Sequence, residues 1–567
     1  MVQSGKRATE ERIRWVFAAI VKVIIFTLAL SWQGAAAARE TVAEQLLDIM
    51  KARHEITEKQ YKDLKKQAQE EQAAMRAAIT RQVEKQLEGR KAAIAEQVKR
   101  QTEGQKAVIA EEVKKQTAKQ TKAQAAALAE QVKAAPTEVV AKKEPYRFET
   151  VWRNGIVTQS LNGNFKLHVG GYGEIDFGGM NADNALEGLA RATGTTATGY
   201  GTEIRRFRPT MTGTLWGDID FEGQMDFGGG NVRATNVWTK LKGIPYIGNI
   251  QIGHQKENFS LEALTSDEWT TFMERALPNT FAVGNPYKAY NTGIKVYNQA
   301  LDKRMTWAVG GYINQSNSSG SFFNNYANTD LAVRLTALPW CADNGRDLLH
   351  VGLSYSYRAR EASHPGLEYQ STPEFHLTNT YTIDTGLLPA TAANTLDPEL
   401  ALVLGPFSLR GEYFNAMVNA NGKLPVNTVS NLAGTKIANP DFDGYYMEAC
   451  YFLTGERRPY DKNQGIFTRP IPLHNFNIKD GGWGAWELTA RFSNTNLSNG
   501  GVTGGDENDV TAGINWYLNP NVKLQLNYIY AHIFDRTYVV GSGSSASLKT
   551  VNDGNAHIVG MRMLYDF

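Results

Sequence analysis

The chain has 567 residues and a formal net charge of +2, and this small value hides two regions of opposite sign. Residues 1–144 carry 27 Lys and Arg against 19 Asp and Glu, whereas residues 145–567 carry 33 against 39. Two cysteines are too few for a disulfide framework, and the basic first region mixes both signs, so neither a disulfide-rich scaffold nor a nucleic-acid-binding protein is expected.

Residues 1–38 have the pattern of a secretory signal peptide. Four basic residues precede an apolar run from Trp15 to Trp32, and the alanines at 35–38 provide a small-residue cleavage site. A retained membrane anchor is the weaker alternative, because the run is short and contains Lys22. We therefore expect an exported chain that starts near Ala38 or Arg39.

Residues 39–135 are predicted to form a long helix that assembles as a periplasmic coiled coil. The segment is rich in Ala, Gln, Glu and Lys, and a fifteen-residue unit repeats, QVEKQLEGRKAAIAE from Gln82 and QVKRQTEGQKAVIAE from Gln97. Its apolar seam is thin, so self-association is the natural way to bury it, and fifteen residues in four turns favour a straight or right-handed coil. A solitary charged helix or a disordered stalk is the alternative. Residues 136–164 are expected to be a linker.

From Phe165 to Phe567, apolar residues recur at every second position, which indicates β-strands. Tight connections alternate with long polar ones, and this rhythm predicts an all-β transmembrane barrel of about 16 antiparallel strands. No apolar run in this region is long enough for a membrane helix. The final strand, HIVGMRMLYDF, ends on an aromatic residue and resembles the C-terminal signature of outer-membrane proteins.

The third long connection, between strands near residues 249 and 298, does not alternate and is expected to fold into the barrel. A capping box from Thr265 to Glu268 and apolar residues at helical spacing, Trp269, Phe272, Met273 and Ala276, predict a short amphipathic helix. With its apolar side on the wall, the helix would turn polar side chains to the lumen and narrow the pore. The predicted constriction residues are Glu262, Asp267, Glu268, Thr271, Glu274 and Arg275.

Several sequence blocks in this region resemble the phosphate-selective porin O and P family. They are, in order, IRRFRPTMTGTLWGDIDFEGQMDF, FSLEALTSDEWTTFMERALP, HVGLSYSYR, FSLRGEYF, GYYMEACYFLTGE, GAWELTARF and INWYLNPNVKLQLNYIYA. The resemblance covers the expected barrel and none of the coil. It implies a homotrimer of sixteen-stranded barrels, each with its own pore and an inward third loop.

The resemblance weakens at the residues that would select phosphate. Phosphate-selective members use lysines in the third loop and an outer arginine ladder, whereas Ala263 and Glu268 stand here at the loop positions. The outer segment EYQSTPEFHLTNT contains no Arg or Lys. The predicted pore-wall residues are Lys166, Glu174, Arg205, Arg206, Arg208, Glu222 and Asp226. Each retained arginine could contact solutes or could be an ordinary wall charge paired with a facing carboxylate.

The sequence therefore predicts a passive outer-membrane channel for small hydrophilic solutes or inorganic ions, with weak selectivity. A phosphate- or pyrophosphate-selective channel is one alternative, and a structural protein whose barrel anchors the coil is another. No HExxH, CxxC, P-loop or GxSxG motif is present, so no enzyme, cofactor or metal site is expected. The expected partners are membrane lipid, further copies of the chain, the transported solutes and, through the coil, the cell wall.

Overall fold

A computed structural model describes residues 147–567, apart from 231, 284–289, 314–328, 343–344, 360–366, 424–435 and 541–546. The expected signal peptide, the expected coiled coil and the start of the expected linker lie outside the described residues. Neither of the cysteines, Cys341 and Cys450, is in a disulfide, as expected.

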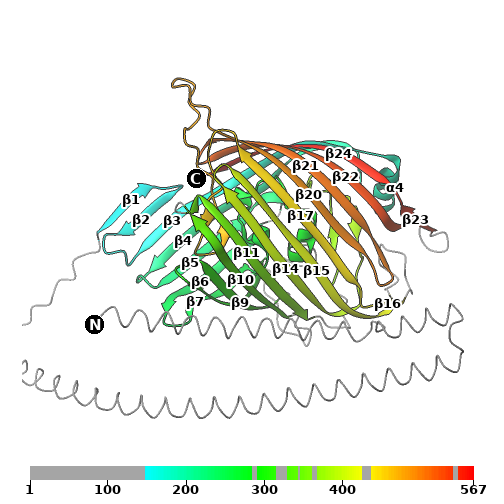
Figure 1. Cartoon of the computed structure of the whole chain (residues 1–567), viewed down its shortest axis with the longest axis horizontal. Helices are drawn as coiled ribbons and strands as arrows, with labels where there is room; N and C mark the ends of the chain where they lie inside the picture. The colour runs from blue at the N-terminus through cyan, green and yellow to red at the C-terminus, as the bar shows by residue number, and fades with distance from the viewer. Residues whose placement is uncertain are drawn as a thin grey trace, which may run out of the picture. The chain divides into compact units, whose positions relative to one another are not determined.

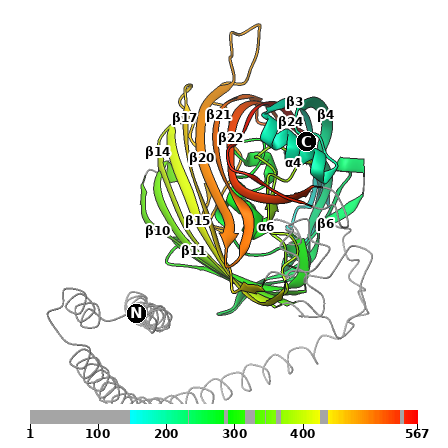
Figure 2. The ribbon, with the colours of Figure 1, turned by 90° about the vertical axis from the view of Figure 1, so that its right-hand side faces the viewer.

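Sixteen strands in the described part of the chain pair antiparallel in chain order, and the last returns to the first, so the barrel is closed (Figures 1 and 2). The predicted barrel and its strand number are confirmed. The strands are β3 (Lys166–Ala182), β4 (Gly199–Leu215), β5 (Ile219–Asp226), β6 (Arg233–Ile244), β7 (Gly248–Lys256), β8 (Tyr290–Ala300), β9 (Met305–Ile313), β10 (Thr329–Ala342), β11 (Asp347–Ala359), β14 (Ala390–Leu404), β15 (Phe407–Lys423), β17 (Asp441–Phe452), β20 (Ala485–Asn499), β21 (Val502–Asn519), β22 (Val522–Val540) and β24 (Gly554–Asp566). We call the end where β3 starts and β24 stops the termini end, and the opposite end the loop end.

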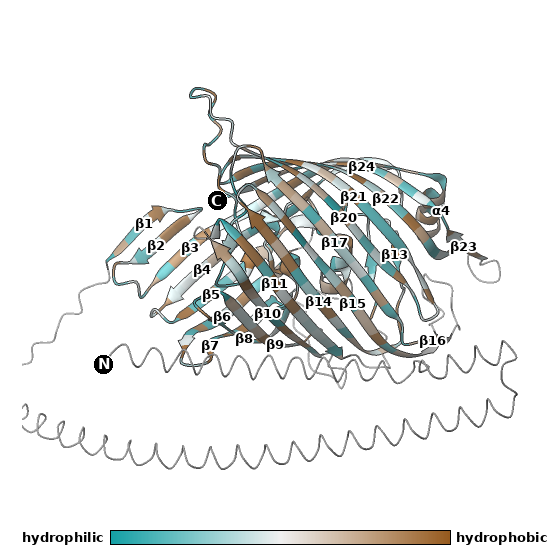
Figure 3. Ribbon diagram, viewed as in Figure 1, coloured by the Kyte–Doolittle hydropathy of each residue, from teal (hydrophilic) through white to brown (hydrophobic). Residues whose placement is uncertain are grey.

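Hydrophilic and hydrophobic residues alternate along the strands (Figure 3), and the exposed fractions of their side chains show which of them face outward. On β4, Phe207 and Met211 are exposed on the outside, whereas Arg206 and Arg208 are buried inside. The other strands repeat this division, because neighbouring side chains of a strand point to opposite faces. No helix in the described part of the chain combines the length and apolar character of a membrane-spanning helix.

A hairpin of β1 (Phe148–Trp152) and β2 (Ile156–Ser160) extends the wall at the termini end (Figure 1). β2 pairs with the first residues of β3, where β24 has already ended, and Phe567 exchanges two backbone hydrogen bonds with Gly171 just above it. This part of the segment predicted as a linker, 136–164, is therefore an ordered extension of the sheet.

Short elements occupy the connections. At the loop end, α4 (Asn184–Thr193) is capped by Asp183 and buries Leu186 and Leu189. The remaining elements are η2 (Gly228–Gly230), α5 (Leu261–Leu264), η3 (Asp267–Trp269), η4 (Leu277–Asn279), α6 (Thr280–Val283), β12 (Gln370–Ser371), β13 (Ile383–Asp384), β16 (Lys436–Ala438), β18 (Tyr460–Asp461), β19 (Ile466–Phe467) and β23 (Ser547–Val551).

Three connections fold into the barrel and form a hydrophobic core inside it. We call residues 257–283 loop 3, residues 367–388 the outer plug and residues 456–469 the inner plug. Phe281 of loop 3 packs on Tyr369 of the outer plug and on Phe414 of the wall, with ring centroids 5.1 and 6.3 Å apart. Aromatic packing of this kind stabilises the folded connections inside the barrel.

Candidate functional site in the barrel interior

Loop 3 crosses the interior in a mostly non-helical conformation. The predicted amphipathic helix is wrong: a 3₁₀ turn, η3, ends at Trp269, and Thr270 and Ala276 are extended. Thr270 has φ −61° and ψ 148° as the residue that ends this turn. The segment therefore needs hydrogen-bond partners other than its own backbone.

Side chains of the facing wall supply these partners. Asn515 and Gln525 donate to the carbonyl of Thr271 at 2.8 and 2.9 Å. Asn527 accepts from the Met273 amide at 2.9 Å, and Arg491 donates to the Glu274 carbonyl at 3.1 Å. Since a helix would use these backbone groups internally, the wall competes successfully with helix formation.

The start of loop 3 is fixed by a carboxylate of the wall. Glu412 on β15 accepts from the amides of Leu261 and Glu262 at 2.6 and 3.0 Å. Glu262, a predicted constriction residue, is itself buried and accepts from the Ala276 amide at 3.2 Å and the Asn279 side chain at 2.5 Å. Burial raises the pKa of Glu262 to about 7. This residue therefore closes loop 3 on itself.

The arginines of β4 reach the interior together because the strand contains a bulge. The register between β3 and β4 shifts after Glu174, which pairs with Arg206, while Ile175 pairs with Ile204. Arg205 is the extra residue, and a bulge lets two consecutive side chains point the same way. Arg205 consequently donates two hydrogen bonds to Glu274 of loop 3, at 2.7 and 2.9 Å.

These arginines form an ion-pair network with loop 3. Arg206 binds Glu174 at 2.6 Å, and Arg208 binds Asp226 at 2.9 Å and Asp267 at 2.6 Å. Although burial acts to raise it, the pKa of Asp267 is held well below its usual range by Arg206, Arg275 and Arg208. The alternative of paired wall charges is therefore the one that the geometry favours for the β4 arginines.

A further arginine from β24 joins this network and was missed in the sequence. Arg562 binds Asp176 at 2.7 Å, Glu274 at 2.8 Å and Glu174 at 3.3 Å. Its inward parity in HIVGMRMLYDF was the available signal. Because β24 lies beside β3 in the closed barrel, the last strand supplies a charge to a site that the sequence places near residue 206.

The remaining predicted residues fall into two groups. Thr271 and Arg275 bind protein groups: Thr271 donates to Glu448 of the wall at 2.8 Å, and Arg275 donates to the carbonyls of Glu262 and Thr265 at 3.1 and 2.9 Å. The others, Lys166, Glu222 and Glu268, stand apart from the network. Lys166 is exposed at the termini end, whereas Glu222 and Glu268 line a chamber described below.

The outer plug enters from the loop end and brings carboxylates to the arginines of the wall. Glu374, from the EYQSTPEFHLTNT segment, pairs with Arg491 and accepts from Ser493 at 2.6 Å and Thr511 at 2.7 Å. Asp384 of the same plug pairs with Arg536 at 3.2 Å. The plug thus neutralises arginines of the wall.

The inner plug enters from the termini end and contacts loop 3 on the side that faces that end. Arg458 donates to the carbonyl of Trp269 at 3.1 Å and pairs with Glu487 of the wall at 2.5 Å. Ile466 and Phe467 bury their side chains beside Leu261. The sequence of this connection has no periodic signal that would indicate its inward course.

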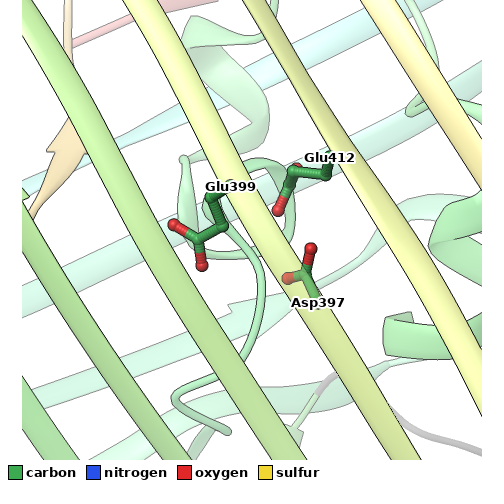
Figure 4. A group of neighbouring side chains, drawn as sticks. All are labelled: Asp397, Glu399 and Glu412. Carbon is green, nitrogen blue, oxygen red and sulfur yellow. The ribbon is translucent and has the colours of Figure 1, made fainter. Parts of the chain in front are cut away.

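Three carboxylates meet inside the wall: Asp397 and Glu399 on β14 and Glu412 on β15 (Figure 4). Glu399 accepts from Arg334, His350 and Ser354. Glu412 already binds the loop 3 amides and Tyr446. Since two of the three groups are occupied by donors, this cluster offers a cation only Asp397, which is too little for an oxygen-rich Ca²⁺ or Mg²⁺ site.

A chamber of about 850 Å³ lies between loop 3 and the termini end. The inward faces of β4 to β8 form its wall, residues 264–269 of loop 3 form one end, and residues 461–469 of the inner plug border it. Glu222, Lys240 and Lys295 line it, and sequence analysis missed the two lysines although their inward parity was available.

Sequence comparison relates this architecture to known proteins. The profile described as phosphate-selective porin O and P matches residues 167–567. An uncharacterised protein of Caulobacter vibrioides is 27% identical over 474 residues, which cover 80% of this chain and 85% of that protein. Porin O of Pseudomonas aeruginosa is 22% identical over 410 residues, which cover 67% of this chain and 86% of that protein.

Structure comparison finds other barrels of the outer membrane. The channel DcaP of Acinetobacter baumannii aligns with a TM-score of 0.42 at 10% identity and covers 72% of this chain and 99% of its own. The anion-selective porin from Comamonas acidovorans aligns with a TM-score of 0.40 at 12% identity and covers 71% of this chain and all of its own. With the family profile matched over the barrel, the chain belongs to the phosphate-selective porin O and P family and is a porin-like channel of the outer membrane.

Proposed function

We propose that the barrel is a weakly selective channel for small hydrophilic solutes and ions. The observation that carries this proposal is the pairing of interior charge: every buried arginine in the described interior lies in an ion pair with a carboxylate. The pairs outside the β4 network are Arg334–Glu399, Arg358–Glu257, Arg410–Glu448, Arg458–Glu487, Arg491–Glu374 and Arg536–Asp384.

Paired arginines are poor anion receptors. An anion sheds its hydration in a pore only for several converging charge-assisted donors, and those donors are here bound to carboxylates. Outside these pairs, three buried acids without an ion pair in the described structure, Asp397, Glu507 and Asp509, stand against three interior lysines that likewise form none there, Lys256, Lys295 and Lys523. The interior therefore lacks the positive excess that strong anion selectivity requires.

Planar-bilayer recording of the purified full chain tests the proposal. We expect open channels with a zero-current potential near zero in a salt gradient and with chloride conductance that phosphate does not block at micromolar concentration. A strong anion preference with block at micromolar phosphate would contradict it. That result would favour the phosphate- or pyrophosphate-selective alternative, for which Lys240 and Lys295 in the chamber are the residues to mutate first.

We also propose that the channel works as a homotrimer with residues 39–135 in the periplasm. The support is the family membership and the fifteen-residue repeat of the N-terminal segment. Absence of stable conductance from folded protein would favour the alternative in which the barrel anchors the coil.

A further inference from the structure

The chamber beside loop 3 is lined mainly by groups that carry no net charge. Side-chain amides from four neighbouring strands line it, including Gln224 on β5, Asn236 on β6, the mostly buried Gln251 on β7 and Gln299 on β8. Hydroxyl groups of Thr210 and Thr212 on β4 continue this surface. Each of these amides already has a hydrogen bond to a protein group. An amide can form up to four hydrogen bonds, so each keeps capacity both to donate and to accept. A solute whose hydroxyl groups both donate and accept fits such a surface better than an ion does.

Two aromatic side chains interrupt the amide surface. Trp238 on β6 and Tyr297 on β8 are partly exposed and line the chamber. Their parity places them inside, because Val237 and Ile294 on the same strands are exposed on the outer surface. Ring faces bury the apolar C–H surface of a solute, while the indole N–H and the phenol remain hydrogen-bonding groups.

The chamber lysines are engaged by the protein. Lys240 pairs with Asp220 at 2.9 Å and lies 5.4 Å from the ring centroid of Trp238. Lys295 lies 5.4 Å from the ring centroid of Tyr297, and Lys256 donates to the carbonyl of Ala263 at 2.8 Å. These contacts hold the ammonium groups against the wall and the rings, so they support the aromatic surface more than they offer a converging anion site.

We propose that this chamber is a binding site for neutral polyhydroxylated solutes of the carbohydrate class, with Trp238 and Tyr297 as the stacking surface. The inference rests on the proposed channel function, since the chamber lies on the route between loop 3 and the termini end. Its volume is in the range typical of small-molecule pockets, roughly 300–1,000 Å³. The amides order the hydroxyl groups, and the two rings take the apolar faces of the sugar.

Recording the channel with added maltose or glucose tests the proposal. Maltose is expected to reduce the ionic current in a saturable way, and Trp238→Ala and Tyr297→Ala are each expected to raise the half-blocking concentration about tenfold, the loss of one stacking contact. The matched control is Trp486→Ala. Trp486 of β20 lies on the outer face of the barrel, away from the chamber, and stacks on Trp516 of β21 with ring centroids 5.0 Å apart. Maltose should block this variant at the same concentration as it blocks the unmodified channel.

The outcomes separate this inference from the channel itself. Normal conductance without saturable block by either sugar would overturn the carbohydrate site and leave the channel standing. Stronger block by inorganic phosphate than by maltose, relieved in Lys295→Gln, would assign the chamber to anions instead. If folded protein does not conduct, tryptophan fluorescence of the detergent-solubilised chain still tests the site: a maltose-dependent change that Trp238→Ala abolishes supports it, and no change overturns it.

Discussion

Asp397 is a buried carboxyl without a hydrogen-bond donor in the described structure, and it lies beside the fully bonded Glu412. We expect Asp397→Asn to stabilise the barrel by about 1–3 kcal/mol, because the amide removes the burial of an unpaired acid and can donate to a neighbouring carboxylate. The temperature at which the folded barrel loses its compact migration in a denaturing gel measures the effect. A lower temperature than for the unmodified chain would contradict it.

Glu412→Gln is the matched substitution, and we expect it to lower the stability of the barrel. Its carboxylate accepts the amides of Leu261 and Glu262, and one oxygen would become an NH₂ group that cannot accept them. We expect a loss of about 1–3 kcal/mol and a noisier open channel, because the start of loop 3 loses its charged acceptor. Equal stability of Asp397→Asn and Glu412→Gln would contradict the different roles that we assign to the two carboxylates.

We expect Glu268 to make the selectivity of the channel depend on pH. Burial, with a smaller contribution from Asp566, raises the pKa of this loop 3 carboxyl to about 7. It is neutral well below that value and negative above it, so the preference for cations should increase between pH 6 and pH 8. The zero-current potential measured across this range checks the direction. Glu268→Gln should reduce the change, and an unaltered slope in this variant would assign the change to another group.

At the scale of elements, Arg206 and Arg275 hold loop 3 in place through different contacts. Arg206 sits in the wall between Glu174 and Asp267, whereas Arg275 also donates to three carbonyls of loop 3. We expect either change to Ala to shift the cation-to-anion permeability ratio upward by about fivefold, or about 1 kcal/mol, without closing the pore. Arg275→Ala alone should add fluctuations to the open current. Steady current in both variants would contradict the anchoring role of Arg275.

We expect the inner plug to limit ion flow from the termini end. Replacing residues 457–468 with a short Gly-Ser turn removes the contacts of Arg458 with Trp269 and Glu487 and the packing of Phe467. Single-channel conductance should rise by a factor of roughly two or more, since ion flow follows the narrowest part of the path. Replacing residues 475–481, where Ile478 is 84% exposed, is the control and should leave conductance unchanged.

These elements also show how far the sequence could predict the site. Strand parity puts Arg206, Arg208 and the acidic residues facing them on the same face of their strands, because a period of two is a local property. It could not show that Arg205 lies in a bulge or that Arg562 closes the same network, since both depend on which strands become neighbours. The predicted loop 3 helix is wrong for a related reason. Local spacing favoured a helix, but side-chain amides of the distant wall form hydrogen bonds with the backbone groups that a helix would use.

For the whole molecule, the barrel was predictable because alternation repeats over sixteen strands and each adds an independent signal. The plugs were not, since an irregular connection has no period to indicate whether it folds inward. Asp506, Glu507 and Asp509 illustrate the limit: sequence analysis can take this acidic run for a surface loop, but it lies within β21, and Glu507 and Asp509 are buried. Interior ion pairs such as Arg562–Asp176 and Arg491–Glu374 thus join residues that are far apart in the chain.

The last prediction concerns residues 39–135, which lie outside the described residues. In a trimeric porin the three N-terminal segments start close to one symmetry axis, and their thin apolar seams can be buried against one another, so we expect a closed three-stranded coil. If helical throughout, residues 40–134 would extend roughly 140 Å at about 1.5 Å per residue, far enough to reach cell-wall material in the periplasm. A soluble fragment of residues 40–134 should sediment as a helical trimer at high concentration. Replacing Leu87, Ile94 and Ile109 of the seam with Ser should return it to monomers. A helical or unfolded monomer from the unmodified fragment would contradict the trimeric coil, while leaving the channel proposal for the barrel intact.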